Sequence, residues 1–191
     1  MRKKNIKLWN HLIKELNDFS VQAGWFEGSK YDAETPIAEI AALQNYGGQI
    51  TQVVTDKQRA FLHFMGIHLK NSTRELNIVI PARPFMDNAK ARVQGQEGKN
   101  ILMQEMLRVF EGRQTMKIAC DRLGLWLQGI IQEEIIKIQT PPLSKLTIEN
   151  RKNRYKSTTK KTNAKTLAKP LVDTGVMLAS VGNRTSLQEK Y

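Results

Sequence analysis

Apolar residues recur at steps of three and four along several stretches, the spacing of an amphipathic helix. The stretch 5–19 shows this stripe with Ile6, Trp9, Leu12, Ile13 and Leu16. The same spacing predicts helices over 36–45, 102–110 and 119–138. The last of these is the longest periodic signal in the chain, and it ends at Pro141-Pro142. Proline cannot continue a helix, so the chain turns there.

Shorter stretches alternate between apolar and polar residues or are rich in β-branched ones, the pattern of strands. They cover 21–26, 50–55, 60–64 and 76–80, with a turn predicted at 56–58. The polar stretch 70–75 is expected to be a loop between two of them. The pattern therefore predicts a small, mostly antiparallel sheet of about four strands.

The expected fold class is α+β, with the sheet packed by long helices and followed by an extended basic arm. We assign 1–142 to the core domain and 143–170 to the arm, with a short helix only after Ser144. Residues 171–191 form a C-terminal segment that packs on the core or on a neighbouring subunit. Within it, Asp173 or Thr174 is expected to cap a short helix.

Composition favours an ordinary globular protein, with 40% apolar and 25% charged residues over 191 positions. The single cysteine, Cys120, rules out a disulfide within one chain and fits a reducing compartment. No apolar stretch long enough for a signal peptide or a membrane helix follows the basic N-terminus. We therefore expect a soluble protein that makes no contact with membranes.

The net charge of +12 is concentrated in two segments. Residues 1–14 hold five basic side chains and no acidic one, and residues 145–169 hold nine basic side chains against Glu149. The rest of the chain is nearly neutral, with 16 basic and 17 acidic residues. A polyanion or an acidic protein surface would complement these segments. The alternative is that they are solvated arms without a partner.

No constellation of catalytic residues is visible. The three histidines lack metal-ligand spacing, and no glycine-rich phosphate loop occurs. Cys120 lies beside the apolar face of the long helix, where an inert buried thiol is expected. Ser157 and Lys160 have the spacing of an acyl-transfer pair but lie in the apolar-poor arm. Capping explains Asp173 better than aspartic-protease chemistry does. We expect no enzyme activity, no cofactor and no metal.

Taken in order, five stretches resemble the neck or tail-completion proteins of long-tailed bacteriophages, the family that includes head–tail joining proteins and tail terminators. The stretches are Val21 to Gly28 with Tyr31; Pro36 to Ala42 with Asn45-Tyr46-Gly47; Ile80 to Met86; Pro142-Leu143-Ser144 with Thr147, Ile148 and Arg151; and Lys169 to Gly175 with Met177, Leu178, Ser180 and Val181. The chain departs from the family pattern at Asn45 and Tyr46, and in the length and basicity of its arm.

This resemblance implies an α+β subunit of a homo-oligomeric ring, commonly hexameric, without enzyme activity. Its place would be the neck of the virion, assembled in the bacterial cytoplasm between the portal or connector and the tail tube. A head-to-tail interface would close such a ring. The expected interface residues are Arg83, Pro84, Phe85, Trp25 and Tyr46. The alternative for Arg83-Pro84-Phe85 is a strand-to-helix connector with Phe85 in its own core.

The basic arm has two functional interpretations. It docks on a neighbouring subunit or on an acidic portal or tube protein, or its side chains face DNA in the channel without reading sequence. Docking is favoured slightly, because Tyr155 is the one aromatic residue available there to stack on bases. The residues concerned are Lys145, Arg151, Lys152, Arg154, Lys156, Lys160, Lys161, Lys165 and Lys169.

A different class of protein also fits the charge distribution, a sequence-independent nucleic-acid-binding protein. The two basic segments support it, but no nucleic-acid-binding motif accompanies them. A stable monomer with salt-sensitive affinity for duplex DNA would favour this alternative over the ring.

Overall fold

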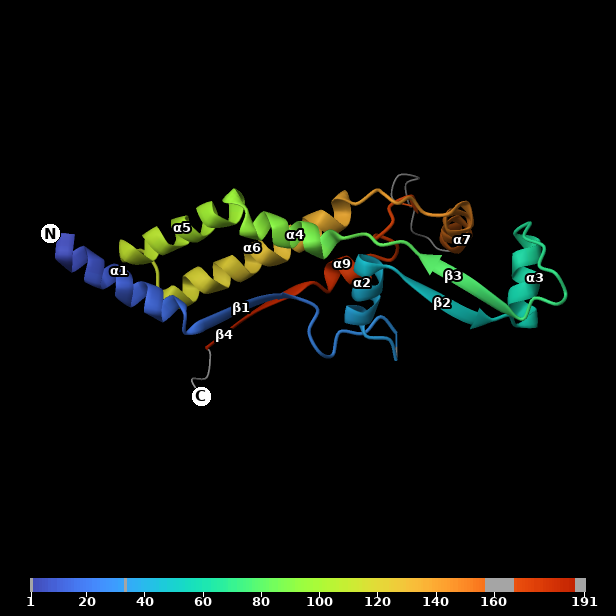
Figure 1. Ribbon diagram of the computed structural model, residues 1–191, viewed down its shortest axis with the longest axis horizontal. Coiled ribbons are helices and arrows are strands. Elements are labelled where there is room, and N and C mark those ends of the chain that lie inside the picture. Colours follow the sequence, from blue (N-terminus) through green and yellow to red (C-terminus); the bar gives the residue numbers. More distant parts are fainter. Residues whose placement is uncertain (1, 33, 157–166, 188–191) are drawn as a thin grey trace.

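The computed structural model describes residues 2–32, 34–156 and 167–187 of the chain. The molecule is elongated, with a helical body at one end and a projecting strand pair at the other (Figure 1). The fold class is α+β, which confirms the expectation from sequence. The four helices predicted from apolar spacing are present as α1 (Arg2–Leu16), α2 (Ile37–Tyr46), α5 (Gln96–Phe110) and α6 (Met116–Lys137).

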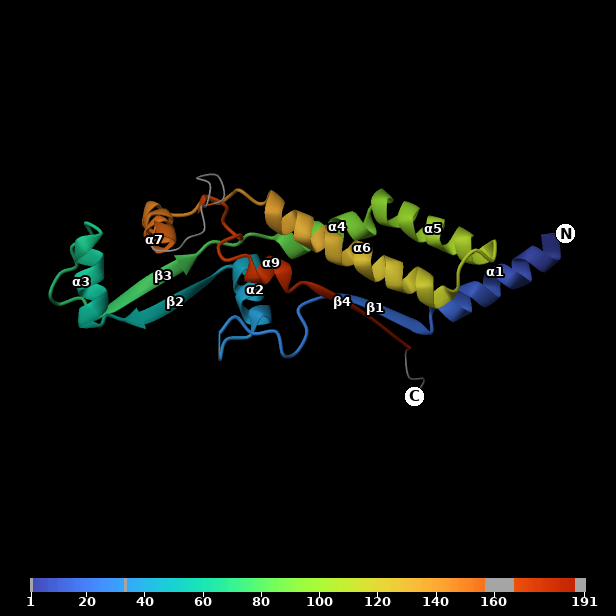
Figure 2. The same ribbon diagram turned by 180° about the vertical axis from the view of Figure 1, so that it is seen from behind.

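The body is built around α6. Against it lie α4 (Phe85–Gln94), α5 and an antiparallel pair of strands, β1 (Phe19–Gly24) and β4 (Gly182–Leu187), and α1 packs against α5 at the outer end (Figures 1 and 2). β1 and β4 join residues more than 150 positions apart, with Phe19 opposite Leu187 and Gly24 opposite Gly182. The C-terminal segment is therefore part of the body.

Two apolar clusters fill the body. The larger one centres on Phe85 and draws on α2, α4, α6 and the C-terminal segment; its buried members are Ile37, Ala41, Phe85, Ala89, Ile130, Ile131, Ile135, Leu171, Met177 and Val181. The smaller one lies where α1, α5 and α6 meet and contains Leu12, Met106, Met116 and Cys120. Each fully buried Ile, Leu, Val, Met or Phe side chain among them stabilises the fold by about 1.5–3 kcal/mol.

The strands differ from the expectation in three ways. Residues 60–64 are not a strand but belong to α3 (Asp56–Phe64). The fourth strand is β4 instead, in the C-terminal segment, for which the sequence pattern predicts no strand. Lastly, the strands form two separate pairs, β1 with β4 and β2 (Gly48–Val53) with β3 (Glu75–Ile80), rather than one sheet. Helix α4 was also not anticipated.

Helix α3 begins with a capping box, which favours a helix at these residues. The Thr55 hydroxyl accepts a hydrogen bond from the Gln58 backbone N–H at 3.2 Å, and the Gln58 side chain accepts one from the Thr55 N–H at 3.0 Å. This reciprocal capping box satisfies two backbone donors that a helix start leaves open. It outweighs the alternating pattern of residues 60–64.

The basic arm is folded where the structure describes it. Residues Lys145–Lys156 form α7, whereas we expected an extended arm with at most a short helix after Ser144. Residues 167–175 then return to the body, and α9 (Val176–Ala179) leads into β4. Lys160, Lys161 and Lys165 lie outside the described residues, as do Ser157 and the side chain of Lys156.

Among the described residues, no helix combines the length and apolar character that crossing a bilayer demands.

Candidate interaction surfaces

The projection, which we define as residues 48–80, consists of β2, α3, β3 and the loops between them. β2 and β3 pair antiparallel along their whole length, from Gly48 opposite Ile80 to Val53 opposite Glu75, without a bulge. The pair extends away from the body and carries α3 at its far end (Figures 1 and 2).

Gly47 forms the base of the projection. Its φ of +72° is a left-handed conformation that side chains rarely adopt. A Cβ at this position would also lie 2.7 Å from the Ala82 nitrogen and 2.8 Å from the Ile80 oxygen. Two chain segments therefore approach closely here, and only glycine fits between them. A side chain at position 47 would force these two segments apart at the base of the hairpin.

Neither face of the strand pair is covered. No residue of β2, α3 or β3 is buried, and several of the exposed ones are apolar. They are Ile50, Val53, Phe61, Phe64, Ile78 and Val79, with exposures from 41% to 80%. Exposed apolar residues that gather on one element mark an interaction surface, whereas scattered ones carry no such meaning.

The outer edges of the strand pair are also open. Among the described residues, no further strand pairs with β2 or β3. Monomeric proteins usually protect such edges with lysine, proline or a bulge. Within the two strands the one charged residue is Glu75, and neither proline nor a bulge is present. Backbone donors and acceptors are therefore available to a neighbouring chain.

Two hydrogen bonds connect α3 to the rest of the tip of the projection. The Arg59 guanidinium donates them to the carbonyl oxygens of Lys70 at 3.0 Å and Thr73 at 2.6 Å, which ties α3 to the following loop. Phe61 and Phe64 lie one turn apart on α3 and are 41% and 80% exposed. These two rings form an exposed apolar tip.

The predicted interface residues divide into buried and exposed ones. Phe85 is fully buried and packs edge-to-face against Trp25, with ring centroids 5.9 Å apart. The Trp25 indole N–H donates to the Met177 carbonyl at 2.9 Å. Phe85 thus serves the core of its own chain, which is the alternative that the sequence left open for the Arg83-Pro84-Phe85 turn, and the half-buried Trp25 packs against it.

Arg83 is equally committed to its own chain. It is 3% exposed, and it donates to the Pro141 carbonyl at 3.2 Å and to the Gln44 side-chain oxygen at 2.9 Å. Burial, together with the nearby Arg151 charge, lowers the pKa of its guanidinium. An interface role does not fit Arg83 or Phe85. Pro84 is exposed, and Tyr46 is 72% exposed at the base of the projection, so both remain accessible.

Asn45 has a structural role that the sequence did not reveal. Its side chain is 2% exposed, its oxygen accepts from the Met86 N–H at 2.9 Å, and its nitrogen donates to the Asp87 carboxylate at 3.1 Å. Asn45 thereby accepts from a backbone N–H group that the start of α4 leaves open, since the N-cap residue Pro84 provides no side-chain cap. Asn45, at which the chain departs from the neck-protein pattern that its sequence resembles, is thus a buried capping residue.

Arg151, a predicted docking residue of the arm, is buried and holds the chain's own backbone. Its guanidinium donates to the carbonyls of Lys169 at 2.7 Å, Leu167 at 3.2 Å and Pro170 at 3.3 Å, and its Nε lies 3.5 Å from the Asp173 carboxylate. Burial lowers its pKa, and the Asp173 charge opposes this. Arg151 therefore fixes the returning segment to α7 and offers no charge to a partner.

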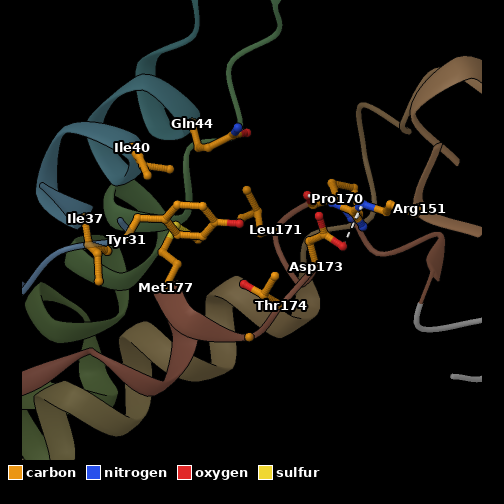
Figure 3. A pocket seen from close by; sticks show the side chains of 11 residues that line it. Tyr31, Ile37, Ile40, Gln44, Arg151, Pro170, Leu171, Asp173, Thr174 and Met177 are labelled. Carbon is orange, nitrogen blue, oxygen red and sulfur yellow. Dashed lines mark hydrogen bonds and ion pairs between the residues drawn. The ribbon is translucent and has the colours of Figure 1, made fainter. Parts of the chain in front are cut away.

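A pocket of about 260 Å³ lies between α2 and this returning segment (Figure 3). Ile37, Ile40 and Met177 line it from one side, and Arg151 with Asp173 closes the other. Since the Arg151 guanidinium is occupied by backbone carbonyls and Asp173, we assign this pocket no ligand.

Other arm cations are partly neutralised within the chain. Lys152 pairs with Glu149 at 2.8 Å, and Arg154 pairs with Asp173 at 2.9 Å. Asp173 thus binds arginines rather than capping α9, whose N-cap is Gly175 in a left-handed conformation. Thr174 accepts from the Val176 N–H at 3.4 Å. Lys145 is exposed, whereas Lys169 is half-buried.

The described residues bring together few groups with reactive chemistry. In the described ranges, no three His, Cys, Asp or Glu side chains gather in a metal-binding arrangement. His63 and His68 stack edge-to-face at the exposed tip, with centroids 4.5 Å apart. Cys120 is fully buried, and burial raises the pKa of its thiol, as expected for an inert cysteine.

Comparison with known proteins gave no match, neither to a protein-family model, nor to a curated protein, nor to a solved structure.

Proposed function

We propose that this protein is a structural subunit of a tailed-phage neck, a tail-completion protein that assembles into a homo-oligomeric ring between the connector and the tail tube. The observation that carries the proposal is the projection. Both faces of its strand pair are uncovered and carry exposed apolar side chains, its edges are open, and an isolated two-stranded hairpin is at best marginally stable in water. A subunit with such an element gains a stable structure when a neighbour covers it.

The total surface area supports association. The chain exposes 13,606 Å², whereas a compact monomer of its mass exposes about 9,300 Å². An allowance of about 2,600 Å² covers the most that the sixteen residues outside the description could expose. An excess of about 1,700 Å² remains, which is close to two subunit faces of a standard interface at about 800 Å² each.

The virion context comes from the sequence resemblance, and the ring size of six and the axial partners follow from it alone. The geometry adds that the projection and the body are different surfaces of one elongated subunit. Contacts between unlike surfaces repeat head to tail, and they close into a ring when the rotation permits. The described part of the arm contributes less than expected, because Arg151 and Arg154 engage their own chain.

The test is the native mass of the purified protein by light scattering, at low and high salt, with electron microscopy of the same sample. We expect a closed multimer, or a monomer that forms rings when isolated tail tubes are added. A monomer at every concentration that ignores tubes and connectors would contradict the proposal.

The alternative, a sequence-independent nucleic-acid-binding protein, is tested in parallel by titrating duplex DNA at several salt concentrations. It predicts a monomer whose affinity falls steeply with salt. The intrachain pairing of Arg151, Lys152 and Arg154 reduces the number of cations available for this role.

A further inference from the structure

A second uncovered apolar surface lies at the other end of the molecule, where α1 packs against α5 (Figures 1 and 2). A groove of about 270 Å³ opens there; we call it the α1–α5 groove, and its lining consists of Ile6, Trp9, Leu107 and Phe110. The half-buried Trp9 and Phe110 rings pack edge-to-face, with centroids 5.2 Å apart. Ile6 is 56% exposed and Leu107 is 44% exposed, so the groove is open to a partner.

Apolar side chains extend the groove along both helices. Ile13 is exposed two turns after Ile6 on α1, and Met103 is exposed one turn before Leu107 on α5. A groove of this form receives the apolar face of a partner helix, whose anchors recur at i, i+3 or i+4, and i+7. A cavity of about 150 Å³ holds one benzene-sized group, so the α1–α5 groove has room for one or two large apolar side chains.

Positive charge borders the groove on the α1 side. The segment 2–18 has a net charge of +3, from five basic residues against two acidic ones. Lys7 and Lys14 are exposed, and helical geometry places both about a quarter turn from Ile6. Glu15 lies on the far side of α1, about half a turn from Ile6. In the part of the chain that the structure describes, no ion pair joins Lys7 or Lys14 to another residue. An occupant of the groove therefore meets two lysines without an acidic partner.

The α5 side of the groove does not cancel this charge. Residues 96–113 contain three acidic and three basic side chains. Each of the three carboxylates is already in an ion pair: Glu97 with Arg92 at 2.9 Å, Glu111 with Arg113 at 3.1 Å, and the buried Glu105 with Arg122 at 3.3 Å. The rim is basic as a whole, and a partner that complements it carries acidic side chains.

We propose that the α1–α5 groove binds an acidic amphipathic helix of another protein. The apolar side chains of that helix enter the groove, and its carboxylates lie beside Lys7 and Lys14. The contact is at the end of the molecule opposite the projection. It is therefore separate from the surface that the proposed ring uses and does not depend on the ring.

A second copy of this chain complements the groove less well. Another α1 brings the same excess of basic residues, and the segment 56–75 at the tip of the projection holds four basic residues against two acidic ones. Like charges brought together weaken association.

Membranes and nucleic acids also complement basic charge, but they make less use of the groove. A helix at a membrane surface buries its apolar face in the bilayer, whereas Leu12 of α1 is 6% exposed and belongs to the same apolar cluster as Met106 of α5. Duplex DNA binds lysines through its phosphates, which gain nothing from an apolar groove. Both classes of partner are outcomes of the test.

Peptide selection identifies the chemistry of the occupant. A displayed library of random peptides of about 16 residues, long enough for four helical turns, is enriched for binding to the full-length protein. We expect the enriched sequences to be net acidic, with apolar residues at helical spacing. Enrichment of neutral or basic sequences, or none above that on the bare support, would overturn the proposal.

Variants then place the binding in the groove. A fluorescently labelled copy of the most enriched peptide is titrated by polarisation at low and high salt. We expect Lys7→Glu/Lys14→Glu to raise the dissociation constant at least about tenfold at low salt, and Leu107→Gln to raise it about tenfold at both salt concentrations. The matched control is Lys57→Glu/Lys70→Glu, which makes the same charge change on exposed lysines of the projection and should alter the constant less than about twofold. Equal weakening by both double variants would contradict a contact in the groove.

Two parallel titrations use vesicles of equal parts phosphatidylcholine and phosphatidylglycerol, and a short duplex DNA. Tighter binding of either one than of the peptide would replace the acidic helix by a membrane surface or by nucleic acid. Light scattering without peptide reports assembly independently. A multimer that binds no acidic peptide would overturn the groove contact and leave the ring standing, and a monomer that binds one in the groove would do the reverse.

Discussion

The body and the projection contain similar apolar residues, which are buried in the body and exposed in the projection. Phe85 in the body is fully buried, whereas Phe64 in the projection is 80% exposed, although each belongs to a short helix of nine or ten residues. The difference lies in what surrounds each helix. α4 packs against α5 and α6, while α3 sits at the far end of the β2–β3 hairpin, away from the helices of the body.

This comparison shows how an apolar residue can serve assembly instead of folding. Body residues stabilise the subunit, since their burial is complete within one chain. Projection residues are exposed in the single chain, so under the proposed assembly their contribution appears on association. The predictions below test whether the two regions separate in this way.

The largest effect is expected from truncating the two phenylalanines. Phe85→Ala removes a fully buried ring and should lower the free energy of unfolding by about 3–5 kcal/mol. Phe64→Ala should change the stability of the monomer by no more than about 0.5 kcal/mol and should weaken assembly. Urea denaturation and light scattering measure the two effects. Equal destabilisation by both variants would remove the distinction between body and projection.

A smaller effect is expected at Arg92, which joins the helices of the body. Its guanidinium binds Glu97 at 2.9 Å, Glu133 at 2.9 Å and the buried Glu134 at 3.0 Å. Arg92→Ala leaves the buried Glu134 carboxylate with the Lys137 ammonium at 3.5 Å as its remaining ion pair among the described residues. We expect the free energy of unfolding to fall by about 2 kcal/mol. Arg113→Ala is the matched control; it breaks an exposed pair and should cost less than about 1 kcal/mol.

The Arg92 cluster also predicts an acid dependence. The hydrogen bond from Arg92 holds the pKa of the Glu97 carboxyl below its ordinary value. A carboxyl with a lowered folded pKa stabilises the protein above its unfolded pKa, and this contribution disappears as the pH falls through the folded value. The stability difference between wild type and Arg92→Ala should therefore shrink below about pH 4. An unchanged difference in acid would show that Glu97 does not contribute.

The last prediction concerns the rate at which a thiol reagent labels cysteine in the native protein. Burial raises the pKa of Cys120, so its reaction with a thiol reagent should be at least about tenfold slower in the native than in the unfolded protein. A thiol introduced by Phe64→Cys at the tip should react at the rate of a free thiol in the monomer and more slowly after assembly. Fast labelling of native Cys120 would contradict the packing of α1, α5 and α6.

Much of the body could be predicted from sequence, because its helices carry their apolar faces at regular spacing. The four stripes recognised in the chain correspond to α1, α2, α5 and α6. The two wrong strand predictions have different causes, a distant partner for β4 and a local capping box for residues 60–64. β4 is polar and becomes a strand because β1 and α6 lie beside it. Residues 60–64 alternate like a strand, yet the Thr55–Gln58 capping box makes them a helix.

The candidate interaction residues were predicted less well for a physical reason. Arg151 appears in sequence as one cation in a basic run, and its burial depends on carbonyl groups 16–21 positions further along. Arg83 and Phe85 have residue types common at interfaces, but the same types suit a buried connector. A usable signal for the projection existed in the two nearly uncharged strands, Gly48–Val53 and Glu75–Ile80, since such edges need a cover.

Hydrogen exchange of the hairpin backbone is the most direct test of the claim that the projection is an assembly surface. In a dilute monomer, we expect the amides of β2 and β3 to exchange far faster than those of α6, because an uncovered hairpin opens easily. Assembly should slow exchange in β2, β3 and α3 and leave the centre of α6 unchanged. A hairpin already as protected as α6 in a verified monomer, or one unaffected by assembly, would contradict the account.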